Sequence, residues 1–514
     1  MTLSVRTAES GVREVGSSVA ELVWFRAVTS AQHVYLQSAD GRRSITYGEL
    51  CGEVARWSGL LADLGAGPGD TVGLALSDPV ELAVAFVAAV AAGRTVAPLD
   101  PAATDGELAA ACGRTAPRVV VSDRRAPDDG RAWWVVMTPE ERNVGGARSS
   151  AGPPPWSGEG GVVLSTSGTT GAPKVIGLDE AQLLGTASSV AAHFELSPGD
   201  RGFNALPLFH INAEVVGVLA TLVSGGTIVL DDRFHRRGFW DVMARHRITW
   251  INGVPAILAR LAVLEEDERV PAGIRFARSA SAPLPVPVLE RFEQATGIPV
   301  VETYGMTEAA SQITANPLGR RLPGSVGLPV GTDVRVVSGP GAAAVPGSVG
   351  RVEIRGPSVI RAYLSPGYED RVDADGWLET GDVGYVDDAG YLFLVGRADD
   401  VINRGGEKIY PREVEDALCG EPGVRSAAVV GRDDEVLGSV PVAYLVVDSV
   451  SNEEDGPLAA LVVERVHERC TRVLSRSKRP VAYHVVDRIP QGATGKVRRS
   501  ALAEANVIFS MSVR

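Results

Sequence analysis

The sequence is most informative where it reads Ser165-Thr166-Ser167-Gly168-Thr169-Thr170-Gly171-Ala172-Pro173-Lys174, directly after the apolar run Gly161-Val162-Val163-Leu164. This composition predicts a phosphate-binding loop at the end of a strand. Gly168 and Gly171 let backbone N–H groups approach an anion without a Cβ atom in the way, while the hydroxyls and Lys174 add donors and one positive charge. The spacing differs from G-x-x-x-x-G-K-[ST], which disfavours an ordinary P-loop NTPase. A plain Ser/Gly/Thr linker has a similar composition, so this segment alone leaves both interpretations open.

Further motifs follow in the order found in one enzyme superfamily. They read Tyr304-Gly305-Met306-Thr307-Glu308, then Glu379-Thr380-Gly381-Asp382 with Gly396-Arg397-Ala398-Asp399-Asp400, and finally Gly495-Lys496. Together with the loop, they resemble the adenylate-forming acyl-CoA synthetases, and the resemblance extends from Thr46-Tyr47-Gly48-Glu49-Leu50 to Arg499. It implies an α/β fold with a large N-terminal domain of layered sheets and helices, residues 1–398. A small mobile α+β C-terminal domain, residues 399–514, would carry the catalytic lysine.

Composition agrees with a large enzyme. The chain has 514 residues with 45% hydrophobic content, so two or more domains are expected. Its formal net charge of −13 argues against a general nucleic-acid-binding protein, which needs a basic surface. The four cysteines are scattered without a C-x-x-C pair, which favours reduced thiols in a cytoplasmic protein. We expect no targeting segment and no membrane span, because the longest pure apolar run, Leu82 to Ala92, is too short.

Apolar periodicity predicts alternating helices and strands. The apolar residues between Leu50 and Leu64 recur at helical spacing and stop at Gly65, a typical helix C-cap. Further predicted elements are a strand at 71–76, a helix at 82–92, a strand at 119–121, a buried helix followed by a strand at 215–230, a helix at 239–245 and a strand at 248–251. This alternation favours largely parallel sheets in layers.

The resemblance implies a role for each nucleotide-binding motif. The loop would hold the β and γ phosphates of ATP, Glu308 would bind Mg²⁺, and Asp382 would accept hydrogen bonds from both ribose hydroxyls, with Arg397 as a second ribose contact. The implied ATP-binding residues are Ser165, Thr166, Ser167, Gly168, Thr169, Thr170, Gly171, Lys174, Ser281, Ala282, Pro283, Glu302, Thr303, Tyr304, Gly305, Met306, Thr307, Asp382, Arg397 and Lys408. Taken alone, Glu308 also suits a helix N-terminus and Asp382 a polar turn.

Lys496, Glu308 and Thr170 are the implied catalytic residues. Lys496 lies in a glycine-bounded turn, and its family counterpart bridges the carboxylate and the α-phosphate, where a charged lysine draws two anions together. A solvated lysine near Arg498 and Arg499 is the structural alternative. The resemblance places the hinge at Asp399, and Gly405 and Gly406 would admit the pantetheine chain of coenzyme A after the C-terminal domain has rotated.

The activated acid is the least constrained part of the prediction. The implied pocket residues are His210, Asn212, Ser279, Tyr304, Gly305 and Ser311. An α-amino acid is disfavoured, because Pro207 to Glu214 lacks the aspartate that amino-acid-activating domains carry there. Two stretches look closest to oxalate-CoA ligases, but that branch has histidines at the positions of Asn212 and Ser311, which weakens the case for a dianion. We therefore expect another small or aryl carboxylic acid.

The acceptor of the activated acyl group has alternatives. Coenzyme A is the expected one, but some relatives load a free-standing carrier protein, and others deliver the adenylate to a nitrogen nucleophile or activate nitrite. A nucleotide-binding regulator without activity is a different class of explanation. The full set Lys174, Glu308, Asp382, Arg397 and Lys496 disfavours it, because a regulator does not need transition-state groups.

Overall fold

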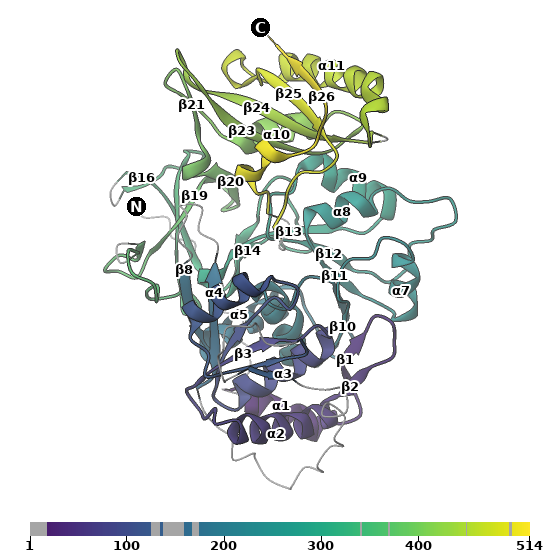
Figure 1. The fold of residues 1–514 in the computed structure, drawn as a ribbon, viewed down its shortest axis with the longest axis vertical. Coiled ribbons are helices and arrows are strands. Elements are labelled where there is room, and N and C mark those ends of the chain that lie inside the picture. Colours follow the sequence, from purple (N-terminus) through teal and green to yellow (C-terminus); the bar gives the residue numbers. More distant parts are fainter. Residues whose placement is uncertain are drawn as a thin grey trace.

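The computed structural model describes residues 18–124, 134–136, 159–166, 174–339, 342–368, 371–448, 450–492 and 496–513. A large N-terminal part forms the body of the molecule, and a smaller C-terminal part sits at one end of it (Figure 1). The prediction of a large layered α/β domain with a small α+β domain after it is confirmed.

A nine-stranded sheet crosses the N-terminal domain in the order β15-β14-β13-β12-β11-β9-β10-β1-β2. Pairing is parallel from β1 to β13, and antiparallel where β14 joins β13. The strands are β1 (Val34–Ser38), β2 (Ser44–Thr46), β9 (Arg201–Asn204), β10 (Thr227–Leu230), β11 (Trp250–Gly253), β12 (Phe276–Ser279), β13 (Val300–Met306), β14 (Ser311–Ala315) and β15 (Leu328–Pro329).

A second, six-stranded sheet in the order β6-β5-β3-β4-β7-β8 is parallel except for its last pair. Its strands are β3 (Thr71–Ala75), β4 (Thr95–Pro98), β5 (Val119–Ser122), β6 (Trp134–Val136), β7 (Gly161–Thr166) and β8 (Lys174–Asp179). The strands are short apolar runs, as parallel strands covered on both faces require.

The third sheet corrects the expectation of largely parallel sheets, because every pair in it is antiparallel. Its order is β17-β16-β18-β19-β20. The strands are β16 (Asp333–Gly339), β17 (Ala342–Ala343), β18 (Gly350–Arg355), β19 (Leu378–Val386) and β20 (Leu392–Arg397). Polar and apolar residues alternate in β16, and antiparallel strands of this kind need no helical crossover between them.

Helices cover the two mixed sheets. They are α1 (Val19–Thr29), α2 (Tyr47–Asp63), α3 (Pro79–Ala91), α4 (Asp105–Thr115), α5 (Glu180–His193), α6 (Ala220–Ser224), α7 (Phe239–Arg245), α8 (Pro255–Leu261) and α9 (Val286–Thr296). The start of α2 follows from its sequence, because Thr46 and Glu49 form a capping box that satisfies the exposed N–H groups of the first turn. The predicted helix before β10 exists, but its first part, Ala213–Leu219, is π-helical.

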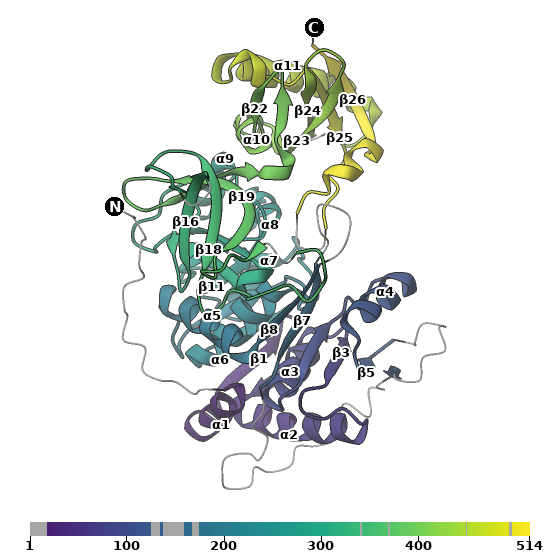
Figure 2. The same ribbon diagram turned by 90° about the vertical axis from the view of Figure 1, so that its left-hand side faces the viewer.

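The C-terminal domain consists of one sheet with two helices. Its strands are β21 (Ile402–Arg404), β22 (Glu407–Ile409), β23 (Val424–Asp434), β24 (Gly438–Val447), β25 (Ala482–Val486) and β26 (Val507–Ser512), and its helices are α10 (Pro411–Cys419) and α11 (Gly456–Val473). Helix α11 lies on the side away from the N-terminal domain (Figures 1 and 2). Helix α10 contacts α9 and β20 of the N-terminal domain.

The buried side chains form separate cores in the two domains. The largest apolar cluster runs from Val19 to Leu392, and the main C-terminal cluster runs from Ile402 to Val485. The two clusters share no residue. None of the helices in the described ranges combines the length and the apolar character that crossing a membrane requires.

Candidate active site

The strands β13, β19 and β20 bring a polar cluster together. Tyr304 Oη donates a hydrogen bond to Asp382 Oδ2 at 2.5 Å, and an Arg397 nitrogen lies 3.3 Å from Oδ1. Burial raises the pKa of Asp382, and the charge of Arg397 opposes this rise. A Cβ on Gly381 would lie 2.9 Å from the Arg397 guanidinium at a φ of +78°, so glycine lets the guanidinium stay beside the carboxylate. The cluster presents the carboxylate and guanidinium predicted for a ribose.

A second cluster lies where β13 ends and β8 begins. Glu308 is buried in the short turn after β13, and Tyr363 donates a hydrogen bond to its Oε1 at 2.9 Å. Lys174 Nζ lies 5.0 Å from the ring centre of Tyr363 and 4.8 Å from that of Tyr368. Burial lowers the pKa of Lys174, and the negative charge of Glu308 opposes this decrease. Glu308, the predicted metal ligand, and Lys174, the predicted phosphate-binding lysine, therefore both lie beside Tyr363, and their charges interact.

The predicted phosphate loop starts and ends at paired strand positions. Thr166 on β7 is the antiparallel partner of Lys174 on β8. Ser165 Oγ accepts a hydrogen bond from Arg114 Nε at 2.7 Å, which ties α4 to the start of the loop. The predicted residues between them, Ser167, Gly168, Thr169, Thr170 and Gly171, lie outside the described residues.

Strained backbone marks the same region. Ser281, Ala310 and Ser311 have φ angles of +70°, +49° and +99°, which residues with a Cβ rarely adopt. A Cβ on Gly305 would lie 1.6 Å from the Ser311 carbonyl oxygen, so β13 and β14 approach closely only because position 305 is glycine. Such backbone positions concentrate at functional sites. Ala282 and Pro283 follow the first strained residue, and Met306 and Thr307 follow the close approach.

The predicted acid pocket holds buried polar groups. Asn212 Nδ2 donates to Ser281 Oγ at 3.3 Å, and its Oδ1 accepts hydrogen bonds from Asn252 and Arg278, each at 3.1 Å. Burial, reinforced by the charge of Lys496, lowers the pKa of His210 to about 4, so its imidazole is neutral at pH 7. A π-helical turn begins directly after Asn212, a distortion frequently found at functional sites.

Other predicted pocket residues lie around this group. Ser279 is buried at the end of β12, and its carbonyl oxygen accepts from Thr303 Oγ1 at 3.1 Å. Ser311 is buried at the start of β14, opposite Met306.

Lys496 reaches the N-terminal domain from the C-terminal one. Its positive charge lowers the pKa of His210 and also acts on Asp382, two groups at different ends of the site. The backbone supports this turn, because Lys496 O accepts from Gly492 N at 2.8 Å and Val497 bridges to Gln491. The turn extends from the C-terminal domain toward the N-terminal domain (Figure 2). In this orientation of the domains, Lys496 is near enough to the N-terminal domain for its charge to act on His210 and Asp382.

The residues predicted to meet coenzyme A lie elsewhere in this orientation. Gly405 and Gly406 are exposed on the hairpin between β21 and β22. Lys408, which was predicted to bind ATP, is exposed on β22 of the same hairpin. Within the described residues, the hydrogen bonds of this hairpin stay in the C-terminal domain, such as Gly406 N to Asn403 Oδ1 at 3.1 Å. Asp399 lies in a single 3₁₀ turn, Ala398–Asp400, directly after Arg397.

Sequence reasoning missed the contact between the domains. Glu302 was predicted as an ATP-site residue, but its side chain pairs with Arg412 of α10 at 3.2 Å, and both are buried. Arg291 on α9 donates to the carbonyl oxygens of Cys419 and Val424, each at 3.3 Å. No spacing rule in the sequence could pair Arg412 with Glu302, 110 positions away.

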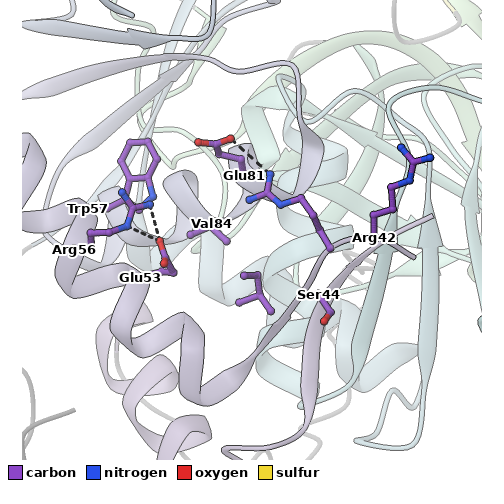
Figure 3. Close-up of a pocket in the computed structure, with 9 residues that line it drawn as sticks. Arg42, Ser44, Glu53, Arg56, Trp57, Glu81 and Val84 are labelled. Atoms are coloured by element: carbon purple, nitrogen blue, oxygen red, sulfur yellow. Dashed lines mark hydrogen bonds and ion pairs between the residues drawn. The ribbon is translucent and has the colours of Figure 1, made fainter. Parts of the chain in front are cut away.

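A cavity of about 310 Å³ lies apart from this site, between β2, α2 and α3 (Figure 3). Arg43 lies 2.8 Å from Asp78, and Arg56 lies 2.6 Å from Glu53. The lining also includes Trp57, over which the Arg56 guanidinium lies at 5.4 Å. Its charges are balanced locally, and the predicted site residues do not line it.

Two family models match the chain. The AMP-binding enzyme model covers residues 24–364, and the AMP-binding enzyme C-terminal domain model covers residues 413–496. The chain is 36% identical to the sulfoacetate–CoA ligase of Cupriavidus necator, over 95% of this chain and 98% of that protein. It is 33% identical to the oxalate–CoA ligase of Arabidopsis thaliana, over 91% and 94%.

A solved structure shares the whole architecture. The o-succinylbenzoate CoA synthetase of Bacillus subtilis, in complex with its acyl-adenylate intermediate, matches with a TM-score of 0.80 at 28% identity, covering 95% of this chain and 98% of that one. The same synthetase in complex with ATP and magnesium ion matches with a TM-score of 0.79.

Proposed function

Since this chain belongs to the AMP-binding enzyme family and is an AMP-forming acyl-CoA synthetase, we propose that the residues assembled above carry its two half-reactions. In the first, the carboxylate of a small acid attacks the α-phosphorus of ATP and pyrophosphate leaves. In the second, the thiol of coenzyme A displaces AMP from the acyl-adenylate. ATP, Mg²⁺ and coenzyme A are the co-substrates and metal of this reaction.

The nucleotide would be held at two ends. Asp382 accepts hydrogen bonds from the ribose, held in place by Tyr304 and Arg397. Lys174 and the loop before it hold the terminal phosphates, with Thr170 as the catalytic hydroxyl. Glu308 is a carboxylate whose charge acts on Lys174, and carboxylate oxygens suit a hard cation such as Mg²⁺. When bound, Mg²⁺ would neutralise part of the phosphate charge.

The position of Lys496 is the observation that carries this proposal. Its charge acts on His210 in the predicted acid pocket and on Asp382 in the predicted ribose cluster, so Lys496 lies within electrostatic range of both groups. A fixed cation there stabilises the charge that develops when carboxylate and α-phosphate approach each other. The proton of the lysine is not transferred in this role.

We place the domain boundary at Arg397 to Asp400, so that residues 1–398 and 399–514 move against each other. The separate apolar cores support this division, because neither core has to be broken when the domains rotate. In the second orientation, Gly405 and Gly406 replace Lys496 at the site and admit the pantetheine chain. Their exposure and their φ angles of +59° and +90° suit close approach by a ligand.

A small or aryl acid fits better than a long aliphatic acid or an α-amino acid. Sulfoacetate, oxalate and o-succinylbenzoate, the acids in the names of similar proteins, are all compact. The buried polar side chains around Asn212 also disfavour an alkyl chain, which would leave their donors unsatisfied. All four cysteines are buried, which is in keeping with a cytoplasmic enzyme.

The test measures pyrophosphate release and products by mass spectrometry, using Mg-ATP and a panel of small aliphatic and aryl acids. We expect Lys496→Ala to slow acyl-adenylate formation on the order of a hundredfold, by the loss of one transition-state cation. Lys478→Ala is the matched control, because Lys478 pairs with Glu413 at 2.6 Å within the C-terminal domain. Equal rates in wild type and Lys496→Ala would contradict the proposed role.

The same assay tests the acceptor. Acyl-CoA formed only when coenzyme A is present supports transfer to the thiol. An acyl-adenylate that the thiol does not consume would indicate a free-standing carrier protein or a nitrogen nucleophile as the acceptor.

A further inference from the structure

Arg278 is a buried cation without an acidic partner. It lies on β12, is 1% exposed, and donates to three amide oxygens: Asn252 Oδ1 at 3.0 Å, Asn212 Oδ1 at 3.1 Å and Gln312 Oε1 at 3.3 Å. Among the described residues, no carboxylate lies within ion-pair distance of its guanidinium. Burial lowers its pKa to about 9, which leaves it charged at pH 7. A buried charge is normally paired, so this one calls for an explanation.

The amides around Arg278 turn their donors away from it. Because arginine can only donate, Asn212 and Gln312 must point their oxygens at the guanidinium and their NH₂ groups elsewhere. Asn212 Nδ2 reaches Ser281 Oγ at 3.3 Å. Gln312 Nε2 is buried and has no partner within the described residues. The cluster therefore combines one positive charge with two amide NH₂ groups that do not contact the guanidinium, one of which has no partner within the described residues.

No ion pair joins Arg278 to Glu214, the buried carboxyl group closest in sequence to Asn212, within the described residues. Glu214 follows Asn212 by two residues and is 2% exposed. Burial alone raises its pKa well above the ordinary value, which favours the neutral carboxyl group over a carboxylate. The neutral His210 adds no negative charge either.

The cluster lies beside the proposed acid pocket. Asn212 is two residues from His210, and the charge of Lys496 contributes to the lowered pKa of His210. Ser281 begins the strained segment beside the nucleotide site. An acid whose reacting carboxylate meets Lys496 would thus direct its other end toward Asn212, Ser281 and Gln312.

We propose that Asn212, Ser281 and Gln312, backed by the charge of Arg278, bind a second anionic oxygen group of the activated acid, either a carboxylate or a sulfonate. An acceptor-only anion satisfies all of the donors at once and supplies the missing countercharge. The proposal rests on the proposed function and narrows its substrate to small acids with two acidic groups. Oxalate-CoA ligases have histidines at positions 212 and 311. Such histidines are not needed here, because Arg278 on β12 supplies the positive charge.

The first test uses the wild-type enzyme and acid-dependent exchange of pyrophosphate into ATP. Matched pairs differ only at the second group: malonate against malonamate, sulfoacetate against propionate, and phthalate against benzoate. We expect kcat/KM for a diacid to exceed that of its neutral partner on the order of a hundredfold, because a site built from buried donors rejects a ligand that leaves them unpaired. The preference between sulfoacetate and malonate identifies the second group as sulfonate or carboxylate.

Variants separate binding from a structural role of Arg278. Asn212→Asp keeps the shape and supplies Arg278 with a partner, but sets a negative charge against the second acidic group. We expect it to lower the ratio of diacid to neutral-acid kcat/KM at least a hundredfold. Arg278→Met leaves three buried amide oxygens without their donor, so its kinetics are interpreted together with its Tm. Better activity with neutral acids, or an unchanged ratio in Asn212→Asp, would overturn the inference. If none of the acids supported exchange of pyrophosphate into ATP, the proposed function itself would be rejected.

Discussion

The carboxylate of Glu302 and the guanidinium of Arg412 meet at 3.2 Å, although 110 positions separate them and they belong to different domains. Both are buried, at 3% and 7% exposure. The pair exists in the domain orientation in which the charge of Lys496 acts on His210 and Asp382. It therefore couples a buried charge on β13 to the adenylate-forming arrangement.

Arg412→Met is expected to weaken acyl-adenylate formation more than thioester formation. Glu302 would remain buried and would lose the cation that opposes the rise of its pKa, and removing one partner of a buried ion pair costs up to about 3–5 kcal/mol. The orientation shown here would be populated less, so adenylation in a single turnover should slow by more than tenfold. Transfer to coenzyme A from supplied acyl-adenylate should change much less.

The control is Arg425→Met, which removes an exposed pair with Asp448 at 2.9 Å. Such a pair contributes at most about 1 kcal/mol, so both half-reactions should stay near wild type. Equal losses in both half-reactions of Arg412→Met would show that the Glu302 pair does not favour one orientation.

Glu302 also gives stability a pH dependence. Burial raises its pKa to about 7 from an ordinary value of 4.5, with Arg412 opposing the rise. Between these values the folded chain holds a proton that the unfolded chain releases, so the contribution of Glu302 to the free energy of unfolding falls as pH rises from 4.5 through 7. Glu302→Gln should reduce the difference in stability between pH 5 and pH 8 by roughly 1–3 kcal/mol, measured by urea denaturation.

Glu290→Gln, at an exposed position of α9, controls for the loss of a carboxylate. An identical pH dependence in wild type and Glu302→Gln would contradict the shifted pKa.

Gly381→Ala is expected to weaken ATP binding. The added Cβ would lie 2.9 Å from the Arg397 guanidinium and push it away from Asp382. We expect KM for ATP to rise about tenfold or more, because the displaced side chains would lose one hydrogen bond between a charged group and the ribose. Gly273→Ala is the control, because it also has a positive φ, +101°, but has open space around the new Cβ. If both variants changed KM equally, backbone strain rather than the position of Arg397 would be responsible.

The sequence predicted those helices and motif residues that depend on local patterns. The helix at Phe239–Arg245 is where apolar periodicity predicted it, and Asp382 and Arg397 meet as their motifs implied. The antiparallel sheet from β16 to β20 escaped prediction, because short polar-apolar alternation does not say which strands will pair. Arg278 escaped for a related reason, since nothing in Phe276-Ala277-Arg278-Ser279 distinguishes a buried arginine from an exposed one. Its burial depends on Asn212, Asn252 and Gln312, which come from distant parts of the chain.

Asp399→Pro should separate the two half-reactions in the opposite way to Arg412→Met. Residue 399 lies in a 3₁₀ turn, whose φ of about −50° to −70° suits proline, so the orientation seen here should persist and adenylation should stay near wild type. Rotation of the C-terminal domain requires backbone dihedrals to change at the hinge, and proline fixes φ. Thioester formation from supplied acyl-adenylate should therefore slow by at least tenfold. Asp399→Ala removes the carboxylate but keeps φ free, so it should transfer the acyl group faster than Asp399→Pro. Equal loss of both steps in Asp399→Pro would place the hinge at another residue.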